Sequence, residues 1–179
     1  MNNVRLFEMN YEKDASTIYE MITEGDIYLF SDPVPDQDYE AFVLWLVQKC
    51  KTIFHDFYMI DINGQPAGFI HCFDLQKNEG HCKLTIYVKR AMRFLGVGPV
   101  ATLLYLDILF KKYALKKVYS TVFSYNSESI KGNLQFGFTR EEILYKHHCY
   151  EGHYCDLHVF SISKEQFYQL YSDILTEWS

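Results

Sequence analysis

The chain has 179 residues, a length that suits one domain, and 49% of them are hydrophobic, which is enough to fill a core. A net charge of −6 argues against general nucleic-acid binding, and the most apolar stretch, Pro99 to Phe110, is too short to span a bilayer and contains Asp107. An odd, scattered set of cysteines without a secretion signal predicts free thiols in a reducing, cytoplasmic compartment: Cys50, Cys72, Cys82, Cys149 and Cys155.

The charge is distributed unevenly along the chain. Residues 83–117 carry eight basic side chains and one acidic side chain, whereas the segments on both sides are acidic on balance. A basic island in an acidic chain indicates a site for a small polyanionic ligand. A solvated basic face is the structural alternative.

The first half of the chain predicts strands mixed with helices. Strands are expected at 3–9, 57–62, 67–75 and 82–89. Apolar residues at helical spacing predict helices at 11–23 and 39–51. Two prolines within 31–36 indicate a loop, because proline breaks both periodic structures, and Asn63-Gly64 favours a tight hairpin turn.

In the second half, Gly98-Pro99 is expected to open a helix that runs to about Tyr113, because proline suits the first turn of a helix. The residues expected on the core face of this helix are Val100, Leu103, Leu104 and Ile108. The elements predicted after it are a strand at 118–125, a helix at 127–136, two strands at 139–150 and 153–162, and a short terminal helix. No repeat or linker divides the chain, so a single domain is predicted over 1–179.

The last predicted hairpin is rich in histidine and cysteine, which raises the question of a metal site. With a two-residue turn between its strands, His147 would face Asp156, and Cys149 and Cys155 would lie on opposite faces because side chains alternate along a strand. The two thiols would then share neither a tetrahedral metal site nor a disulfide. We therefore expect no metal here.

The segment from Arg93 to Gly98 carries the most informative pattern, Arg-Phe-Leu-Gly-Val-Gly between a strand and a helix. Glycines let backbone amides approach a ligand closely, and the first N–H groups of the following helix form an anion site with the helix dipole. Arg93 adds a positive charge, so the arrangement suits a pyrophosphate. The pattern matches neither G-x-x-x-x-G-K-[ST] nor G-x-G-x-x-G.

This pattern resembles the acetyl-CoA signature of the GNAT superfamily, [Q/R]-x-x-G-x-[G/A]. A second match supports the resemblance: Asn126 begins a helix that ends at Gly137-Phe138, like the Asn and the Gly-Phe pair of GNAT enzymes. From Val4 to Gln166 the chain is similar to the branch of ribosomal-protein N-terminal, spermidine and amino-sugar acetyltransferases. The resemblance implies an α/β (α+β) fold, with a mixed, mostly antiparallel sheet of about seven strands that is flanked by helices and splayed between strands four and five.

The resemblance also implies a function. The protein would be an acetyl-CoA-dependent N-acetyltransferase, a cytoplasmic monomer or homodimer that acetylates a primary amine by direct transfer in a ternary complex. The acceptor would be a protein N-terminus, a polyamine or an amino sugar. Acidic residues in the N-terminal part, among them Glu24, can recruit a cationic acceptor, with solvated helix ends and loops as the structural alternative.

The resemblance implies roles for individual residues. Backbone groups of Tyr87 and Val88 would pair with the pantetheine arm, and Asn126 would hydrogen-bond near it. The residues implied in cofactor binding are Tyr87, Val88, Arg93, Phe94, Leu95, Gly96, Val97, Gly98, Asn126, Ser129 and Lys131. A helix N-cap is the structural alternative for Asn126, and a loop surface charge for Arg93.

Two departures from the family pattern affect catalysis. Asn133 stands where many members carry a Tyr that acts as general acid, and Asn cannot supply a proton. The fourth strand also lacks the usual carboxylate, which leaves Glu79, His81 and Tyr87 as candidates for the general base beside Asn126 in the catalytic set. For Glu79 and His81, exposed turn positions are the structural alternative. These departures keep a non-catalytic acyl-CoA-binding module or sensor as the alternative function.

Overall fold

The computed structural model describes residues 3–24, 29, 34–35, 38–51 and 56–178. Most of the loop predicted at 31–36 lies outside these residues. The chain divides into two compact units, one formed by Met1–Leu75 and Leu84–Tyr105 and the other by Gln76–Lys83 and Leu106–Ser179. The single domain over 1–179 stays a prediction.

The strands form a mixed sheet of seven strands in the order β1-β2-β3-β4-β5-β7-β6. Their bounds are Val4–Glu8, Asp56–Ile62, Gln65–Gln76, His81–Val88, Lys117–Phe123, Thr139–Tyr150 and His153–Ser163 for β1 to β7. The β4–β5 pair is parallel, with His81–Lys83 beside Lys117–Tyr119, and most other pairs are antiparallel. This confirms the predicted mixed α/β fold, while the splay beyond the paired residues stays a prediction.

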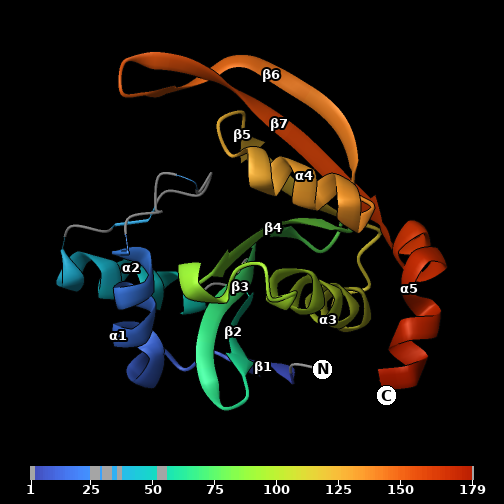
Figure 1. Cartoon of the computed structure of the whole chain (residues 1–179), viewed down its shortest axis with the longest axis horizontal. Coiled ribbons are helices and arrows are strands. Elements are labelled where there is room, and N and C mark those ends of the chain that lie inside the picture. Colours follow the sequence, from blue (N-terminus) through green and yellow to red (C-terminus); the bar gives the residue numbers. More distant parts are fainter. Residues whose placement is uncertain (1–2, 25–28, 30–33, 36–37, 52–55, 179) are drawn as a thin grey trace. The chain divides into compact units, whose positions relative to one another are not determined.

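In the first unit, helices α1 (Tyr11–Ile22) and α2 (Tyr39–Lys51) lie side by side (Figure 1) and share a buried cluster with β2, β3 and β4. Asn10 caps α1, because its side-chain oxygen accepts a hydrogen bond from the Glu12 amide at 3.0 Å. The strands contribute to the cluster through Phe57, Met59, Phe69 and Tyr87. Both helices agree closely with the predicted ranges.

Helix α3 (Val97–Lys112) is buried on more sides than predicted. Of its expected core face, only Leu103 is fully buried, whereas Val100, Leu104 and Ile108 are half-buried. Tyr105 is completely buried, and its hydroxyl donates to the carbonyl of Asp56 and accepts from the amide of Cys72, both at 2.7 Å. The expected face was wrong because the helix is apolar almost all round, so periodicity does not single out one side.

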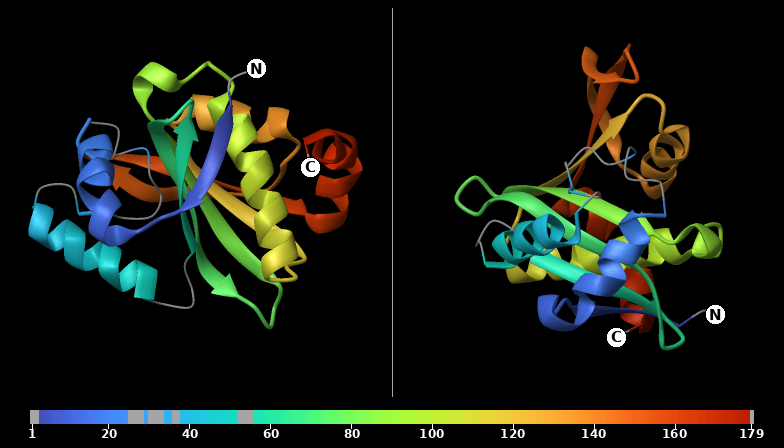
Figure 2. Two further views of the ribbon diagram at one scale, coloured as in Figure 1. Left: turned by 90° about the horizontal axis from the view of Figure 1, so that it is seen from below. Right: turned by 90° about the vertical axis from the view of Figure 1, so that its left-hand side faces the viewer.

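In the second unit, β6 and β7 form a long hairpin whose strands stay side by side along the ribbon (Figures 1 and 2). Helix α4 (Ser127–Phe136) contacts β5 and β6, and α5 (Lys164–Trp178) contacts β7. Both α4 and α5 were predicted. None of the helices in the described part of the chain has the length and hydropathy needed to cross a membrane.

Both predicted hairpin turns are confirmed. Asn63 and Gly64 have φ of 54° and 83°, and Glu151 and Gly152 have φ of 48° and 78°. Two consecutive residues with positive φ match the turn whose twist fits a β-hairpin.

The predicted pairing of His147 with Asp156 is wrong. The register is as predicted from the turn back to His148, which faces Cys155, but it shifts between Leu144 and His148. Lys146 adopts φ 52° in this irregular stretch, and its amide donates to the Asp156 carboxylate at 2.8 Å. A bulge inserts residues into one strand only, so a uniform alternation cannot predict the pairs beyond it.

The backbones of β3 and β4 approach each other closely at Gly68. A side chain at Gly68 would overlap the carbonyl oxygen of Tyr87. We expect Gly68→Ala to lower the free energy of unfolding by about 2 kcal/mol, the usual scale for overpacking. Gly132→Ala is the control, because a Cβ at this helical position meets no atom within 4 Å and should stabilise by about 0.5–1 kcal/mol. Urea unfolding measures both, and a neutral Gly68→Ala would contradict the close approach.

Candidate functional site

The segment between β4 and α3 has the geometry of an anion site. The chain leaves β4, forms the short 3₁₀ helix η2 (Arg90–Met92) and enters α3 at Val97. The amides of Val97 and Gly98 lie in the first turn, where N–H groups have no acceptor within the helix. Gly96 has φ 78°, and no atom lies within 4 Å of the place that a Cβ would take. The backbone here is therefore open to a ligand.

Arg93 is tied to the end of β4. Its Nε donates a hydrogen bond to the carbonyl of Val88 at 2.9 Å. Its guanidinium carbon lies 5.7 Å from the centre of the Tyr87 ring, within the range of a cation–π contact. The positive charge is thus held beside the start of the loop by two neighbours on β4.

Tyr87 links this arginine to the end of α1. Its side chain is 3% exposed, and its ring stacks on Phe69 at 5.4 Å between centroids. The hydroxyl donates to the carboxylate of Glu24 at 2.9 Å. Glu24 and Tyr87 were proposed from the sequence for separate reasons, and no local signal could predict their contact because 63 positions separate them.

Two apolar side chains of the same loop point outward. Phe94 is 91% exposed and Leu95 is 52% exposed, whereas Val97 is buried. Phe94 has φ 65°, a left-handed conformation that is unusual for a bulky residue.

In the second unit, Asn126 is the N-cap of α4. Its Oδ1 accepts from the amide of Ser129 at 3.2 Å, so the structural alternative holds for this oxygen. Lys131 forms an exposed ion pair with Glu128 at 3.6 Å.

Asn133 is engaged by its own helix. Its Nδ2 donates to the carbonyl of Ser129 at 2.8 Å, and its carbonyl accepts from the amide of Phe138 at 2.9 Å. With Gly137 at φ 98° and its amide bonded to the carbonyl of Leu134, this is a Schellman motif. The Gly-Phe pair that supports the family resemblance therefore ends α4.

Two of the candidates for the general base lie near the start of β4, also in the second unit. Glu79 is exposed in the turn that precedes the strand. His81 is half-buried on β4, and its ring lies edge-on to Tyr119 at 5.7 Å. The structure thus brings together Tyr87, Val88 and Arg93 in one unit, and Asn126 with Ser129 in the other.

The cysteine- and histidine-rich hairpin has packing contacts of its own. His148 stacks on Phe123 at 4.3 Å, and the Cys155 thiol contacts the His148 carbonyl at 3.3 Å. Burial and the nearby charge of Asp156 raise the pKa of the Cys155 thiol. All five cysteines are free, and the described residues contain no group of three or more His, Cys, Asp or Glu side chains that can hold a metal.

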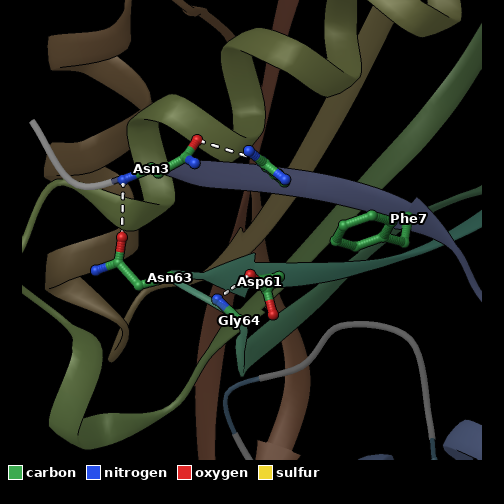
Figure 3. Close-up of a pocket in the computed structure, with 6 residues that line it drawn as sticks. Asn3, Phe7, Asp61, Asn63 and Gly64 are labelled. Atoms are coloured by element: carbon green, nitrogen blue, oxygen red, sulfur yellow. Dashed lines mark hydrogen bonds between the residues drawn. The ribbon is translucent and has the colours of Figure 1, made fainter.

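A shallow cavity of about 240 Å³ lies beside β1 and the β2–β3 turn (Figure 3). Its lining residues are Asn3, Arg5, Phe7, Asp61, Asn63 and Gly64. The hydrogen bonds among them close the turn: the Gly64 amide donates to Asp61 at 2.7 Å and the Asn3 amide donates to Asn63 at 3.4 Å. None of these residues belongs to the predicted site.

Comparisons with known proteins agree with the fold and the predicted family. The model of the Acetyltransferase (GNAT) family matches residues 16–138. The SPbeta prophage-derived uncharacterized N-acetyltransferase YokL of Bacillus subtilis (strain 168) is 27% identical over 123 residues, which are 69% of this chain and 70% of that protein.

Two solved structures illustrate the likeness in fold. The spermidine N-acetyltransferase of Vibrio cholerae in complex with CoA and spermine superposes with a TM-score of 0.84 at 14% identity, over 92% of this chain and 97% of that one. A probable GNAT-family acetyltransferase of Chromobacterium violaceum ATCC 12472 gives a TM-score of 0.77 at 20% identity, over 92% and 84%. Because the family model covers more than half of the residues, the chain belongs to the GNAT acetyltransferase family.

Proposed function

We propose that the protein transfers an acetyl group from acetyl-CoA to a primary amine, directly and within a ternary complex. The observation that carries the proposal is the loop from Arg93 to Gly98, which joins a fixed positive charge, an open glycine and the first turn of a 16-residue helix. Such an arrangement suits a pyrophosphate. Family membership supplies the acyl-CoA to which this pyrophosphate belongs.

The backbone at the end of β4 supports a division of roles. The carbonyl of Tyr87 is turned toward Gly68 on β3, whereas the carbonyl of Val88 is turned toward Arg93. The Val88 carbonyl has a second lone pair and can accept another hydrogen bond. We therefore assign the backbone contact with the pantetheine arm to Val88, and to Tyr87 a contribution through its side chain.

For Asn126 and α4 in the second unit, the family resemblance supports a role in cofactor binding. In Asn126 the helix cap uses Oδ1, and Nδ2 is the donor that can bond the pantetheine arm. Ser129 and Lys131 are proposed to reach the phosphates.

Among the candidates for the general base, Tyr87 is supported best, because its hydroxyl is hydrogen-bonded to the Glu24 carboxylate. An amine must be neutral to attack the thioester carbonyl. The Tyr87 oxygen can accept the amine proton while its own proton passes along the 2.9 Å hydrogen bond to Glu24. The nitrogen–carbon bond forms, the carbon–sulfur bond breaks, and the thiolate takes a proton from solvent, because Asn133 cannot donate one usefully.

A cationic acceptor is favoured over a neutral one. The first unit presents exposed carboxylates on and next to α1 and α2: Glu12, Glu20, Glu24, Asp38 and Glu40. A similar fold binds spermine in the Vibrio cholerae enzyme. Polyamines therefore come first in the acceptor panel, followed by peptides with free N-termini and amino sugars.

The first prediction tests cofactor binding. Gly96→Glu should reduce CoA affinity by at least about a hundredfold, because the new carboxylate occupies the open space and repels the pyrophosphate. Gly64→Glu is the matched control, since Gly64 also has positive φ, 83°, and open space around it. Calorimetry with CoA measures both variants. Unchanged CoA affinity in folded Gly96→Glu protein would show that this loop does not bind the pyrophosphate of CoA.

The second prediction tests the base. For Tyr87→Phe we expect kcat to fall at least about tenfold, which corresponds to a barrier increase of about 1.4 kcal/mol. The measurement is thiol release with the best amine of the panel. The KM for acetyl-CoA should change little, and Glu79→Gln and His81→Gln should stay within about threefold of wild type. A larger loss of kcat in either control would assign the role of general base to that residue.

CoA binding without thiol release for any amine would support the non-catalytic alternative.

The third prediction separates two roles of Asn126. Asn126→Asp keeps an N-cap acceptor and should keep the melting temperature, whereas Asn126→Ala loses the cap, at a cost of about 1 kcal/mol. Both remove the Nδ2 donor, so both should weaken CoA binding, and Asn126→Asp should weaken it at least as much as Asn126→Ala because it also adds a negative charge near an anionic ligand. If Asn126→Asp binds CoA as wild type does, Asn126 is a structural cap only.

A fourth prediction concerns Asn133. Because Asn133 cannot donate a proton usefully, Asn133→Ala should keep turnover within about tenfold of wild type.

A further inference from the structure

Phe94 has a backbone conformation that its side chain disfavours. Six non-glycine residues in the described part of the chain have positive φ, and Phe94 is the only aromatic one among them. In the left-handed region the Cβ of a bulky residue is crowded by its own backbone, so the conformation costs free energy. Such strain persists where the surrounding structure imposes it, and it clusters at functional sites.

The side chain of Phe94 does not offset this cost by packing. It is 91% exposed, more than any other large hydrophobic side chain in the described residues, and its neighbour Leu95 is 52% exposed. Single exposed apolar residues are ordinary on a protein surface. An exposed aromatic ring on a strained backbone, within a ligand-binding loop, calls for a partner that is absent from the free protein.

The position of Phe94 indicates the chemistry of that partner. It lies two residues before Gly96, so their Cα atoms are at most about 7 Å apart. In CoA the adenosine is joined directly to the pyrophosphate that this loop is proposed to hold. The adenine is a flat aromatic base, and an aromatic side chain stacks on such a base without needing a hydrogen-bond pattern.

We propose that Phe94 is the adenine-binding platform of the acyl-CoA site, with Leu95 as its apolar neighbour. The proposal rests on the proposed function, because it requires CoA at this loop. It assigns recognition of the nucleotide to one exposed ring, and it explains why a phenylalanine occupies a position where glycine would be free of strain.

Calorimetry with two ligands tests the stacking. CoA carries the adenine, and 4′-phosphopantetheine has the same arm without it. Phe94→Ala should bind CoA about tenfold more weakly, which is about 1.4 kcal/mol, and should bind 4′-phosphopantetheine as wild type does. Phe94→Tyr keeps the ring and should bind CoA within about twofold of wild type. If Phe94→Ala lost affinity equally for both ligands, or lost none for CoA, Phe94 would not be the adenine-binding platform.

Two further variants give readouts that do not depend on turnover. Phe94→Gly should melt at a higher temperature than Phe94→Ala, because glycine alone removes the strain, while both bind CoA with equal weakness. Phe94→Trp should show fluorescence quenching on addition of CoA and none with 4′-phosphopantetheine. Absence of quenching at saturating CoA would contradict the stack.

CoA binding by the wild-type protein distinguishes the platform at Phe94 from the proposed function. Wild-type protein that binds no CoA would sink the proposed function and the platform together. Wild-type protein that binds CoA, with Phe94→Ala binding it equally well, would sink only the platform.

Discussion

The geometry of the loop depends on one steric constraint, the approach of β4 to β3 at Gly68. The space that a side chain would occupy on β3 is taken by the carbonyl of Tyr87. This sets the backbone at the end of β4, where Val88 turns its carbonyl to Arg93 and Tyr87 places its ring beneath the guanidinium. A larger residue at Gly68 would displace the strand end and, with it, the start of the Arg93–Gly98 loop.

The arginine of the family motif has a structural role as well as a charge. Because its Nε is bonded to the Val88 carbonyl, Arg93 fastens the loop to the strand before any ligand arrives. Tyr87 is held in turn by Phe69 and Glu24. Pre-organised groups lose little freedom when a ligand binds, which favours affinity.

The N-cap of α4, Asn126, and Asn133 near the end of that helix show how a family motif overlaps with helix capping. Asn126 satisfies an amide at the start of the helix, and Asn133 satisfies a carbonyl within it and takes part in the terminal motif at Gly137. A capping residue and a ligand-binding residue have the same sequence signature, so sequence alone cannot separate them. In the structure, Oδ1 of Asn126 caps the helix, and Nδ2 is the donor to which we assign the proposed ligand contact.

The sequence by itself determined the features that depend on neighbours along the chain. The turns at Asn63-Gly64 and Glu151-Gly152, the helix that begins at Val97 and the Arg93–Gly98 motif all follow from local backbone preferences and periodicity. The tertiary structure alone decided the bulge at Lys146, the burial around α3 and the link from Glu24 to Tyr87. These features arise where segments far apart in sequence pack together, and packing depends on shape and on hydrogen-bond partners that a one-dimensional pattern does not contain.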